Sequence, residues 1–550
     1  MTGAEAMAKC LVEEKVDTIF GYPGAAICPL YDSLLNTDID TVLVRTEQNA
    51  GHAASGYART SGKVGVCVVT SGPGALNLLT GIATAFADSI PLVCITGQVE
   101  TDLIGSDVFQ EADVTGAAES FVKYSYLIKN VNDIPRVMKE AFFIASTGRR
   151  GPVVIDIPTD IQNAQIKDFE YPEEVSLRTY RPTVKGHVQQ IKKAIHELEK
   201  SERPLICAGG GVFLSDACSE LQEFAEKHRI PVVSTMMGIG VLPTEHQMYY
   251  GMVGNNGCIA ANRAMKECDT LIMVGARVAD RAVAQPGLVM ENKVLVHIDV
   301  DPAEIGKNVG PTIPIVGDAK HVFHDFDTIE FESEHEEWIS KLEEYRKTGD
   351  GRKPDADYVD PAEFVRKLSL AMDDDAVYIA DVGQNQIWSC HNVVIRSGRF
   401  LTSGGMGTMG YSVPAAMGAK KADPDKQVVA VCGDGSFQMS IPELAVISQS
   451  SLPVKIVVMK NCYLGMVREF EHFNLNDRYA MVKLNDSPDI GLIAKAYGID
   501  YFEADNMKGI DKKISDFLNK DSAAIMQILI DPMDTVRITN TDNAGSRGRI

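Results

Sequence analysis

Long apolar runs and paired cysteines are both missing from this 550-residue sequence. The longest apolar runs, 64–70 and 454–459, have the length of a strand and fall well short of the ~20 residues that span a bilayer. The eleven cysteines are scattered, without a Cys-x-x-Cys pair, which predicts reduced, mostly buried thiols and argues against zinc or iron–sulfur ligation. The N-terminal segment is acidic and amphipathic, unlike a signal peptide, and we expect a cytoplasmic protein.

Clusters of basic residues are also missing. The chain has 53 Lys and Arg against 75 Asp and Glu, a formal charge of −22. Nucleic-acid surfaces need Lys and Arg grouped on one face, so we expect no nucleic-acid partner. An anion could still bind, but only in a local pocket of backbone amides, cations or metal.

Short β-branched runs alternate with helical patterns along the whole chain. Runs that are apolar on both faces belong to parallel sheets covered by helices. We therefore predict an α/β fold, with three domains that each contain a parallel sheet flanked by helices. The expected strands are 41–46, 64–70, 91–97, 152–158, 204–210, 231–236, 269–275, 293–300, 377–383, 427–435, 454–461 and 524–531.

Two segments interrupt the alternation and suggest linkers. Residues 165–187 mix proline and charge with little periodicity, and residues 328–360 are strongly charged. The segments between them have ordinary domain sizes. The predicted domains are 1–165, 186–327 and 360–535, followed by a tail, 536–550, without an apolar pattern.

Residues 427–461 carry the most informative pattern. A strand, the turn "GDGS", a helical pattern over 437–449 and a second strand form a βαβ unit, whose strands run parallel. Asp434 and Asn461 then follow the carboxyl ends of neighbouring strands, where α/β sheets bind ligands. Their oxygens suit Mg²⁺, and the Gly435 and Ser436 amides suit a phosphate. A metal-bridged diphosphate site is predicted, although "GDG" could also be a simple turn.

The same motif gives a family resemblance. "GDG" followed by an Asn some 25 to 30 residues later resembles the thiamine-diphosphate (ThDP) motif. The segment 44-VRTEQNAGHAASGYAR-59 places Glu47 between a strand and a helix. In that family, such a glutamate hydrogen-bonds the aminopyrimidine ring and promotes loss of the thiazolium C2 proton. A lone glutamate here would more often be a helix N-terminal charge, so the two elements together carry the resemblance.

Further segments, from about residue 1 to 530, resemble the large catalytic subunits of the acetolactate synthase (acetohydroxyacid synthase) family. The resemblance implies pyrimidine-binding, central and diphosphate-binding domains in that order. It also implies at least a homodimer, with a possible small regulatory subunit. The matching segments include 21-GYPG-24, 71-SGPGALN-77, 105-GSDVFQEAD-113, 148-GRRGPVVIDIP-158, 297-HIDVDPAEIGKN-308, 381-DVGQNQIW-388, 404-GGMGTMGYSVPAAMGA-419 and 463-YLGMVREFE-471.

The resemblance assigns roles residue by residue. Mg²⁺ would be held by Asp434, Asn461 and the Tyr463 carbonyl, and Met409 would lie under the bent cofactor. The catalytic candidates are Glu47, Phe109, Gln110 and Arg281, the last of which would receive the second keto acid's carboxylate or pair with Asp280. The ThDP candidates are Pro23, Gly24, Glu47, Gly74, Asn77, Gln384, Asn385, Gly407, Met409, Gly433, Asp434, Gly435, Ser436, Asn461, Tyr463 and Met466.

The central domain resembles one that binds FAD, which would be structural because the reaction is not a redox reaction. The segment 208-AGGG-211 is not a GxGxxG fingerprint, so a nicotinamide site is disfavoured. The FAD candidates are Arg149, Gly209, Gly210, Met252, Gly254, Arg277, Asp280, Arg281, Asp299 and Val300.

The implied activity is decarboxylation of pyruvate and condensation with a second 2-keto acid, giving 2-acetolactate or 2-aceto-2-hydroxybutyrate for branched-chain amino acid synthesis. Three alternatives stay open at this point: acetyl transfer to another ketone such as a nucleotide-linked ketosugar, simple decarboxylation, or a non-catalytic homologue. The chain departs from the family's usual residues at Glu100, Thr159, Val253, Phe470 and in the C-terminal tail. Phe470 replaces a Trp associated with preference for 2-ketobutyrate.

Overall fold

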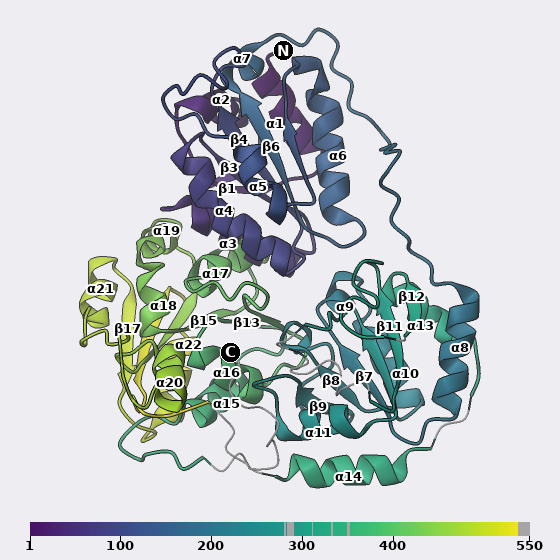
Figure 1. Ribbon diagram of the computed structural model, residues 1–550. Helices are drawn as coiled ribbons and strands as arrows, with labels where there is room; N and C mark the ends of the chain where they lie inside the picture. Colours follow the sequence, from purple (N-terminus) through teal and green to yellow (C-terminus); the bar gives the residue numbers. More distant parts are fainter. Residues whose placement is uncertain (280–281, 283–290, 311, 332–333, 349–351, 537–550) are drawn as a thin grey trace.

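A computed structural model describes residues 1–279, 282, 291–310, 312–331, 334–348 and 352–536. Within these residues the chain forms three six-stranded sheets, and all of their strand pairs are parallel. Figure 1 shows the three sheets as separate units with helices packed around each, the N-terminal unit at the top and the other two below it. The predicted α/β class is confirmed.

The first unit contains the sheet β2-β1-β3-β4-β6-β5. Its strands are β1 (Thr18–Tyr22), β2 (Asp40–Leu43), β3 (Gly65–Val69), β4 (Leu92–Gln98), β5 (Tyr124–Leu127) and β6 (Pro152–Pro158). Its helices are α1 (Gly3–Glu13), α2 (Cys28–Leu34), α3 (Glu47–Ser61), α4 (Pro73–Ala87), α5 (Val114–Ala118), α6 (Ile134–Ser146) and α7 (Thr159–Asn163).

The second unit contains the sheet β12-β11-β10-β7-β8-β9. Its strands are β7 (Pro204–Ala208), β8 (Val232–Ser234), β9 (Tyr249–Met252), β10 (Thr270–Val274), β11 (Val294–Asp299) and β12 (Ile313–Val316). Its helices are α8 (Val188–Glu199), α9 (Gly211–Leu214), α10 (Cys218–Lys227), α11 (Ile259–Glu267), α13 (Ala319–Asp327) and α14 (Glu336–Arg346).

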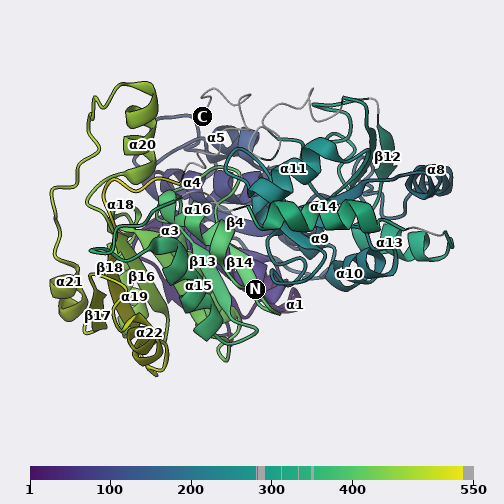
Figure 2. The same ribbon diagram turned by 90° about the horizontal axis from the view of Figure 1, so that it is seen from below.

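The third unit contains the sheet β14-β13-β15-β16-β18-β17. Its strands are β13 (Val377–Ala380), β14 (Arg399–Leu401), β15 (Val428–Gly433), β16 (Lys455–Lys460), β17 (Asp500–Ala504) and β18 (Ala524–Leu529). Its helices are α15 (Pro361–Ala371), α16 (Gln384–Asn392), α17 (Ser412–Ala422), α18 (Asp434–Gln438), α19 (Leu444–Gln449), α20 (Gly465–Asn474), α21 (Ile490–Ala496) and α22 (Ile510–Leu518). Figure 2 shows the second and third units lying beside each other.

Every strand expected from the sequence is present. The pattern missed the central strand β1 and several others, most of which share one cause. Most of them, including β5, β9, β12, β14 and β17, lie at sheet edges. An edge strand is half-covered and lacks the uninterrupted apolar run of a central one. The helix predicted over 437–449 is wrong in its bounds: the structure has α18, a 3₁₀ turn at Ile441–Glu443 and α19, because Pro442 opens a new turn.

The first and third units meet where helix α3 crosses helix α17 (Figure 1). Small residues make this crossing possible. A Cβ on Gly56 would lie 2.0 Å from the Ala415 carbonyl oxygen, and one on Gly418 would lie 1.8 Å from that of Ala53. The two backbones therefore touch, which only glycine allows. A 2.9 Å hydrogen bond between Ser55 and the Tyr411 hydroxyl adds a polar contact.

The eleven cysteines are all free, and seven of them are buried, as the sequence predicts. None of the helices in the described ranges combines the length and the apolar character that crossing a bilayer requires.

Candidate functional site

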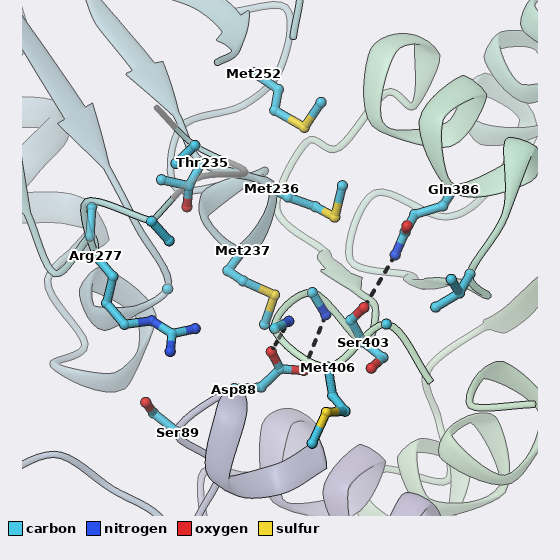
Figure 3. Close-up of a pocket in the computed structure, with 18 of the residues that line it drawn as sticks. Asp88, Ser89, Thr235, Met236, Met237, Met252, Arg277, Gln386, Ser403 and Met406 are labelled. Atoms are coloured by element: carbon cyan, nitrogen blue, oxygen red, sulfur yellow. Dashed lines mark hydrogen bonds between the residues drawn. The ribbon is translucent and has the colours of Figure 1, made fainter. Parts of the chain in front are cut away.

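A continuous cavity of about 1180 Å³ lies where the three units meet. Figure 3 shows side chains from all three converging on it: Asp88 and Ser89 from the end of α4, Arg277 from the second unit, and Ser403 and Met406 from the third. Several methionine side chains, including Met236 and Met237, line the same space. The lining is mostly apolar with a few polar groups, which is typical of a cofactor site.

Asp434 and Asn461 meet at one end of this cavity. They follow β15 and β16, which pair in parallel, so both stand at the same sheet edge. The Cys462 amide donates to Oδ2 of Asp434 at 2.7 Å, and the Tyr463 amide donates to Oδ1 of Asn461 at 2.9 Å. Cys462 has a φ of 60°, so a strained turn presents these groups. Burial raises the pKa of Asp434 to about 6.

The oxygens at this end suit a hard cation better than a soft one. Asp434 offers a carboxylate and Asn461 an amide oxygen, and both residues line the cavity together with Tyr463. In the described part of the chain, no cluster of three or more His, Cys, Asp or Glu side chains could hold a metal. One carboxylate with neutral oxygens fits Mg²⁺, which completes its shell with phosphate and water.

The start of helix α16 closes the same end. Gly383 has a φ of 130°, which glycine adopts readily, and a Cβ on Gly465 would lie 2.0 Å from Oε1 of Gln384. Asn461 donates to that oxygen at 3.2 Å. Asn385 is 3% exposed and lines the cavity, and no described residue bonds its Oδ1. A buried amide atom without a protein partner fits a site built for a polar ligand.

Two buried aspartates hold the loop 402–412, which carries Gly407 and Met409. Asp381 accepts the Gly410 amide at 3.0 Å and the Ser412 amide at 2.8 Å. Asp88, from the first unit, accepts the Gly404 and Gly405 amides (Figure 3). Burial raises the pKa of both carboxyls.

Sequence reasoning missed both of these aspartates. Asp381 could have been noticed, because it lies near the carboxyl end of the predicted strand 377–383, and it directly follows the observed β13. Asp88 follows a helix that is apolar along much of its length and gives no such signal.

Glu47 lies elsewhere. It opens helix α3 after β2, and Asn77 donates to its Oε2 at 3.0 Å. Gly74 packs beside it, since a Cβ there would lie 3.4 Å from Oε1. Asn77 and Asp88 are separated by about 16 Å of helix α4. Among the described residues that line the cavity, neither Glu47 nor Asn77 appears.

The other candidates of the first unit also stand away from the cavity. Pro23 and Gly24 follow β1, and Phe109 and Gln110 follow β4, so they share the carboxyl edge of the sheet with Glu47. Phe109 is 87% exposed. The backbone of Gln110 packs on Gly72, and its φ is 61°. The structure therefore divides the predicted site into two groups, one at the cavity and one on this open edge.

The second unit supplies the far end of the cavity. Arg149 donates to Asp301 and Glu304 at 3.3 and 2.9 Å, and Arg277 donates to the Ala87 carbonyl at 2.7 Å. Six FAD candidates line the cavity: Arg149, Gly210, Met252, Arg277, Asp299 and Val300. Gly209 and Gly254 are not among the described residues that line it, while Asp280 and Arg281 lie outside the described residues. Burial raises the pKa of Asp299 to about 6.

Comparison with protein-family models gives the class. Residues 1–117 match the model described as "Thiamine pyrophosphate enzyme, N-terminal TPP binding domain", residues 191–326 match its central domain, and residues 381–528 match its C-terminal TPP binding domain. The chain is therefore a ThDP-dependent enzyme, built from the three domains of that class.

Similarity to individual proteins narrows the family. A "Probable acetolactate synthase large subunit" of Methanocaldococcus jannaschii is 44% identical over 552 residues, covering 98% of this chain and 93% of that protein. The acetolactate synthase large subunit of Corynebacterium glutamicum is 43% identical, covering 90% and 82%. The isozyme 3 large subunit of Escherichia coli K12 is 40% identical, covering 94% and 92%. The chain belongs to the acetolactate synthase large-subunit family.

Proposed function

We propose that this chain catalyses the decarboxylation of pyruvate and its condensation with a second 2-keto acid, forming 2-acetolactate or 2-aceto-2-hydroxybutyrate. The observation that carries the proposal is the Asp434–Asn461 pair, which lies at the end of a cavity large enough for ThDP. Family membership supports the choice of reaction. We further propose the domain boundaries 1–165, 186–327 and 360–535, with ThDP bound through the first and third.

Mg²⁺ and FAD are part of the proposal. Asp434, Asn461 and the Tyr463 carbonyl would hold Mg²⁺, and the Gly435 and Ser436 amides at the start of α18 would hold the diphosphate. FAD would lie toward Arg149 and Arg277, whose guanidinium groups suit its phosphates. Its role would be structural, since the reaction changes no redox state.

A second copy of the chain would complete the site. The carboxyl edge of the first sheet carries Glu47 beside exposed apolar side chains, among them Tyr22, Leu76 and Phe109. Exposed apolar groups of this size at one sheet edge are typical of an interface. We propose a homodimer, or a dimer of dimers, in which Glu47, Phe109 and Gln110 of one copy face the cavity of the other. A small regulatory subunit would be a further partner.

Bound ThDP would supply an electron sink for the carbanion left by decarboxylation. The chain's own residues would position the reactants. Glu47 would accept a hydrogen bond from the pyrimidine ring and take part in moving its proton. Met409, Gln384 and Asn385 all line the cavity, where Met409 would pack against the cofactor and the two amides would contact its diphosphate. Phe109, Gln110 and Arg281 would contact the keto acids, with the Arg281 fork suited to a carboxylate.

The test is a product assay with purified protein, ThDP, Mg²⁺, FAD and pyruvate, with 2-ketobutyrate added in competition. We expect 2-acetolactate, with a low share of mixed product, because Phe470 lines the cavity and replaces a larger ring. Carbon dioxide or acetaldehyde without acetolactate would contradict the proposal. In that case the acceptor would be another ketone, such as a nucleotide-linked ketosugar, or the enzyme would be a simple decarboxylase.

A further inference from the structure

Helix α3 begins without a cap of its own. Its N-cap residue, Thr46, has extended backbone angles but makes no side-chain bond to the helix. The first turns of a helix leave several amides without intrahelical partners, and a side-chain acceptor usually satisfies one of them. Because Glu47 is the first residue of α3, the order of this helix end decides where its carboxylate points.

A carboxylate from the third unit instead bonds the two residues that lead into the helix. Oε1 of Glu443 accepts hydrogen bonds from the Arg45 amide at 2.9 Å, the Thr46 amide at 3.2 Å and the Asn49 side chain at 2.9 Å. Glu443 ends the 3₁₀ turn at Ile441–Glu443 and is 0% exposed. A carboxylate buried this way is costly unless it is well bonded. Its three donors all belong to the segment that surrounds Glu47.

We propose that Glu443 is a positioning residue for Glu47: it fixes the strand-to-helix turn 44–47 from outside and so orients the Glu47 carboxylate. The anion also faces the positive end of the α3 dipole. Asn77 holds the other side of Glu47, bonding the carboxylate itself at 3.0 Å. The two contacts together restrict both the backbone and the side chain. This inference rests on the proposed function, which makes Glu47 the group that moves a proton at the cofactor.

The position of Glu443 in the chain has a consequence for a dimer. Its turn follows helix α18, which begins at Asp434. One segment of the third unit therefore carries the diphosphate end of its own cavity and also supports Glu47, which would face the second copy's cavity. Loss of Glu443 should weaken the contribution of Glu47 without weakening the diphosphate site that precedes it.

The surroundings of Glu443 Oε2 indicate how a glutamine at position 443 would differ from the glutamate. Among the described residues, no donor reaches Oε2, although the atom is buried. A glutamine would keep one oxygen for the Arg45 and Thr46 amides. Glu443→Gln should therefore preserve most of the positioning, whereas Glu443→Ala removes the acceptor altogether.

Backbone hydrogen exchange of the full-length protein without ligands tests the contact directly. In Glu443→Ala, we expect the Arg45 and Thr46 amides to exchange about tenfold faster or more, because a lost buried hydrogen bond permits local opening. Glu443→Gln should stay close to the parent. Asp40→Asn is the matched control, because it breaks the 2.7 Å ion pair between Asp40 and Lys421, which joins the same two units elsewhere. It should leave residues 45 and 46 unchanged.

The cofactor-loaded protein gives the second readout. In Glu443→Ala, kcat and the rate of C2-proton exchange of bound ThDP should fall together by about tenfold or more, with the half-saturating ThDP concentration little changed. Unchanged exchange at residues 45 and 46 would overturn the inference. So would faster exchange spread over the whole third unit, or an equal loss of ThDP affinity. A parent protein that forms no acetolactate would contradict the proposed function instead. The hydrogen-exchange result would still test the contact between Glu443 and residues 45 and 46.

Discussion

At the scale of single residues, the site depends on polar side chains that are held by the backbone of a neighbouring strand end. Asp434 is the clearest example, because its carboxylate accepts a hydrogen bond from the Cys462 amide, in the turn that also contains Asn461. This hydrogen bond holds together the turns that follow β15 and β16, and Asp434 and Asn461 both line the cavity. The carboxylate therefore has a structural role beside the ligand-binding role that we propose for it.

Replacing Asp434 should separate these roles. Asp434→Asn keeps an oxygen for the Cys462 amide but removes the charge, so we expect the fold to survive and Mg²⁺-dependent ThDP affinity to fall by about tenfold or more. The measurement is the half-saturating ThDP concentration at fixed Mg²⁺, together with the melting temperature of the ligand-free protein. Asp486→Asn is the control, since Asp486 is a surface ion-pair partner of Lys460 nearby. Equal ThDP affinity in parent and Asp434→Asn would remove Asp434 from the metal site.

At the scale of elements, buried aspartates fix the loops that border the two halves of the site. Asp88 and Asp381 hold the loop 402–412. In the first unit, Asp156 at the end of β6 accepts from Thr96 at 2.7 Å and from Gln98 at 2.9 Å. Gln98 in turn donates to the Ala112 carbonyl. The segment that carries Phe109 and Gln110 is thereby tied to the sheet.

Asp156 makes stability depend on pH in a defined direction. Burial raises its pKa in the folded chain to about 7, above the usual value near 4, so folding favours the protonated acid. The stability it contributes is present below about pH 4 and is lost as pH rises through 7. Relative to Asp156→Asn, which resembles the neutral acid, the parent should lose up to ~1.4 kcal/mol per pH unit over that window. Melting temperatures of both proteins from pH 4 to 8 test this, and parallel curves would contradict it.

At the scale of the whole molecule, one chain brings together the cavity and the diphosphate end but leaves Glu47 on an open sheet edge. Helix α4 explains the separation, because its start contacts Glu47 through Asn77 and its end reaches the cavity at Asp88. About 16 Å of rigid helix lies between these two contacts. The backbones of α3 and α17 are in direct contact, which fixes the position of the first unit against the third. Glu47 therefore stays away from the cavity of its own chain.

Mixed dimers test this arrangement. Glu47→Gln and Asp434→Asn should each lose about a hundredfold or more of activity as pure variants. Mixed in equal amounts under conditions that exchange subunits, they should recover about a quarter of parental activity, because half the dimers then contain one intact shared site. Assay of acetolactate after mixing, with each variant alone as control, is the measurement. No recovery despite proven subunit exchange would place both groups in one chain's site.

The α/β class, the existence of most central strands and the Asp434–Asn461 pair could all be predicted from the sequence alone. Uninterrupted apolar runs mark buried parallel strands, and a βαβ unit leaves little freedom in where its strand ends lie. Edge strands such as β5 and β17 were not predicted, because a strand covered on one side only has a weaker apolar pattern.

Only the tertiary structure revealed what Asp88, Asp381 and Glu443 contact. Each of these carboxylates accepts hydrogen bonds from backbone amides far along the chain. Almost every residue has a backbone amide, so the sequence does not indicate which one a carboxylate will bond. The placement of Glu47 away from its own chain's cavity was likewise decided by packing, through the glycine-mediated crossing of α3 and α17. Local pattern sets which elements form, whereas the contacts between distant elements set which polar groups can act together.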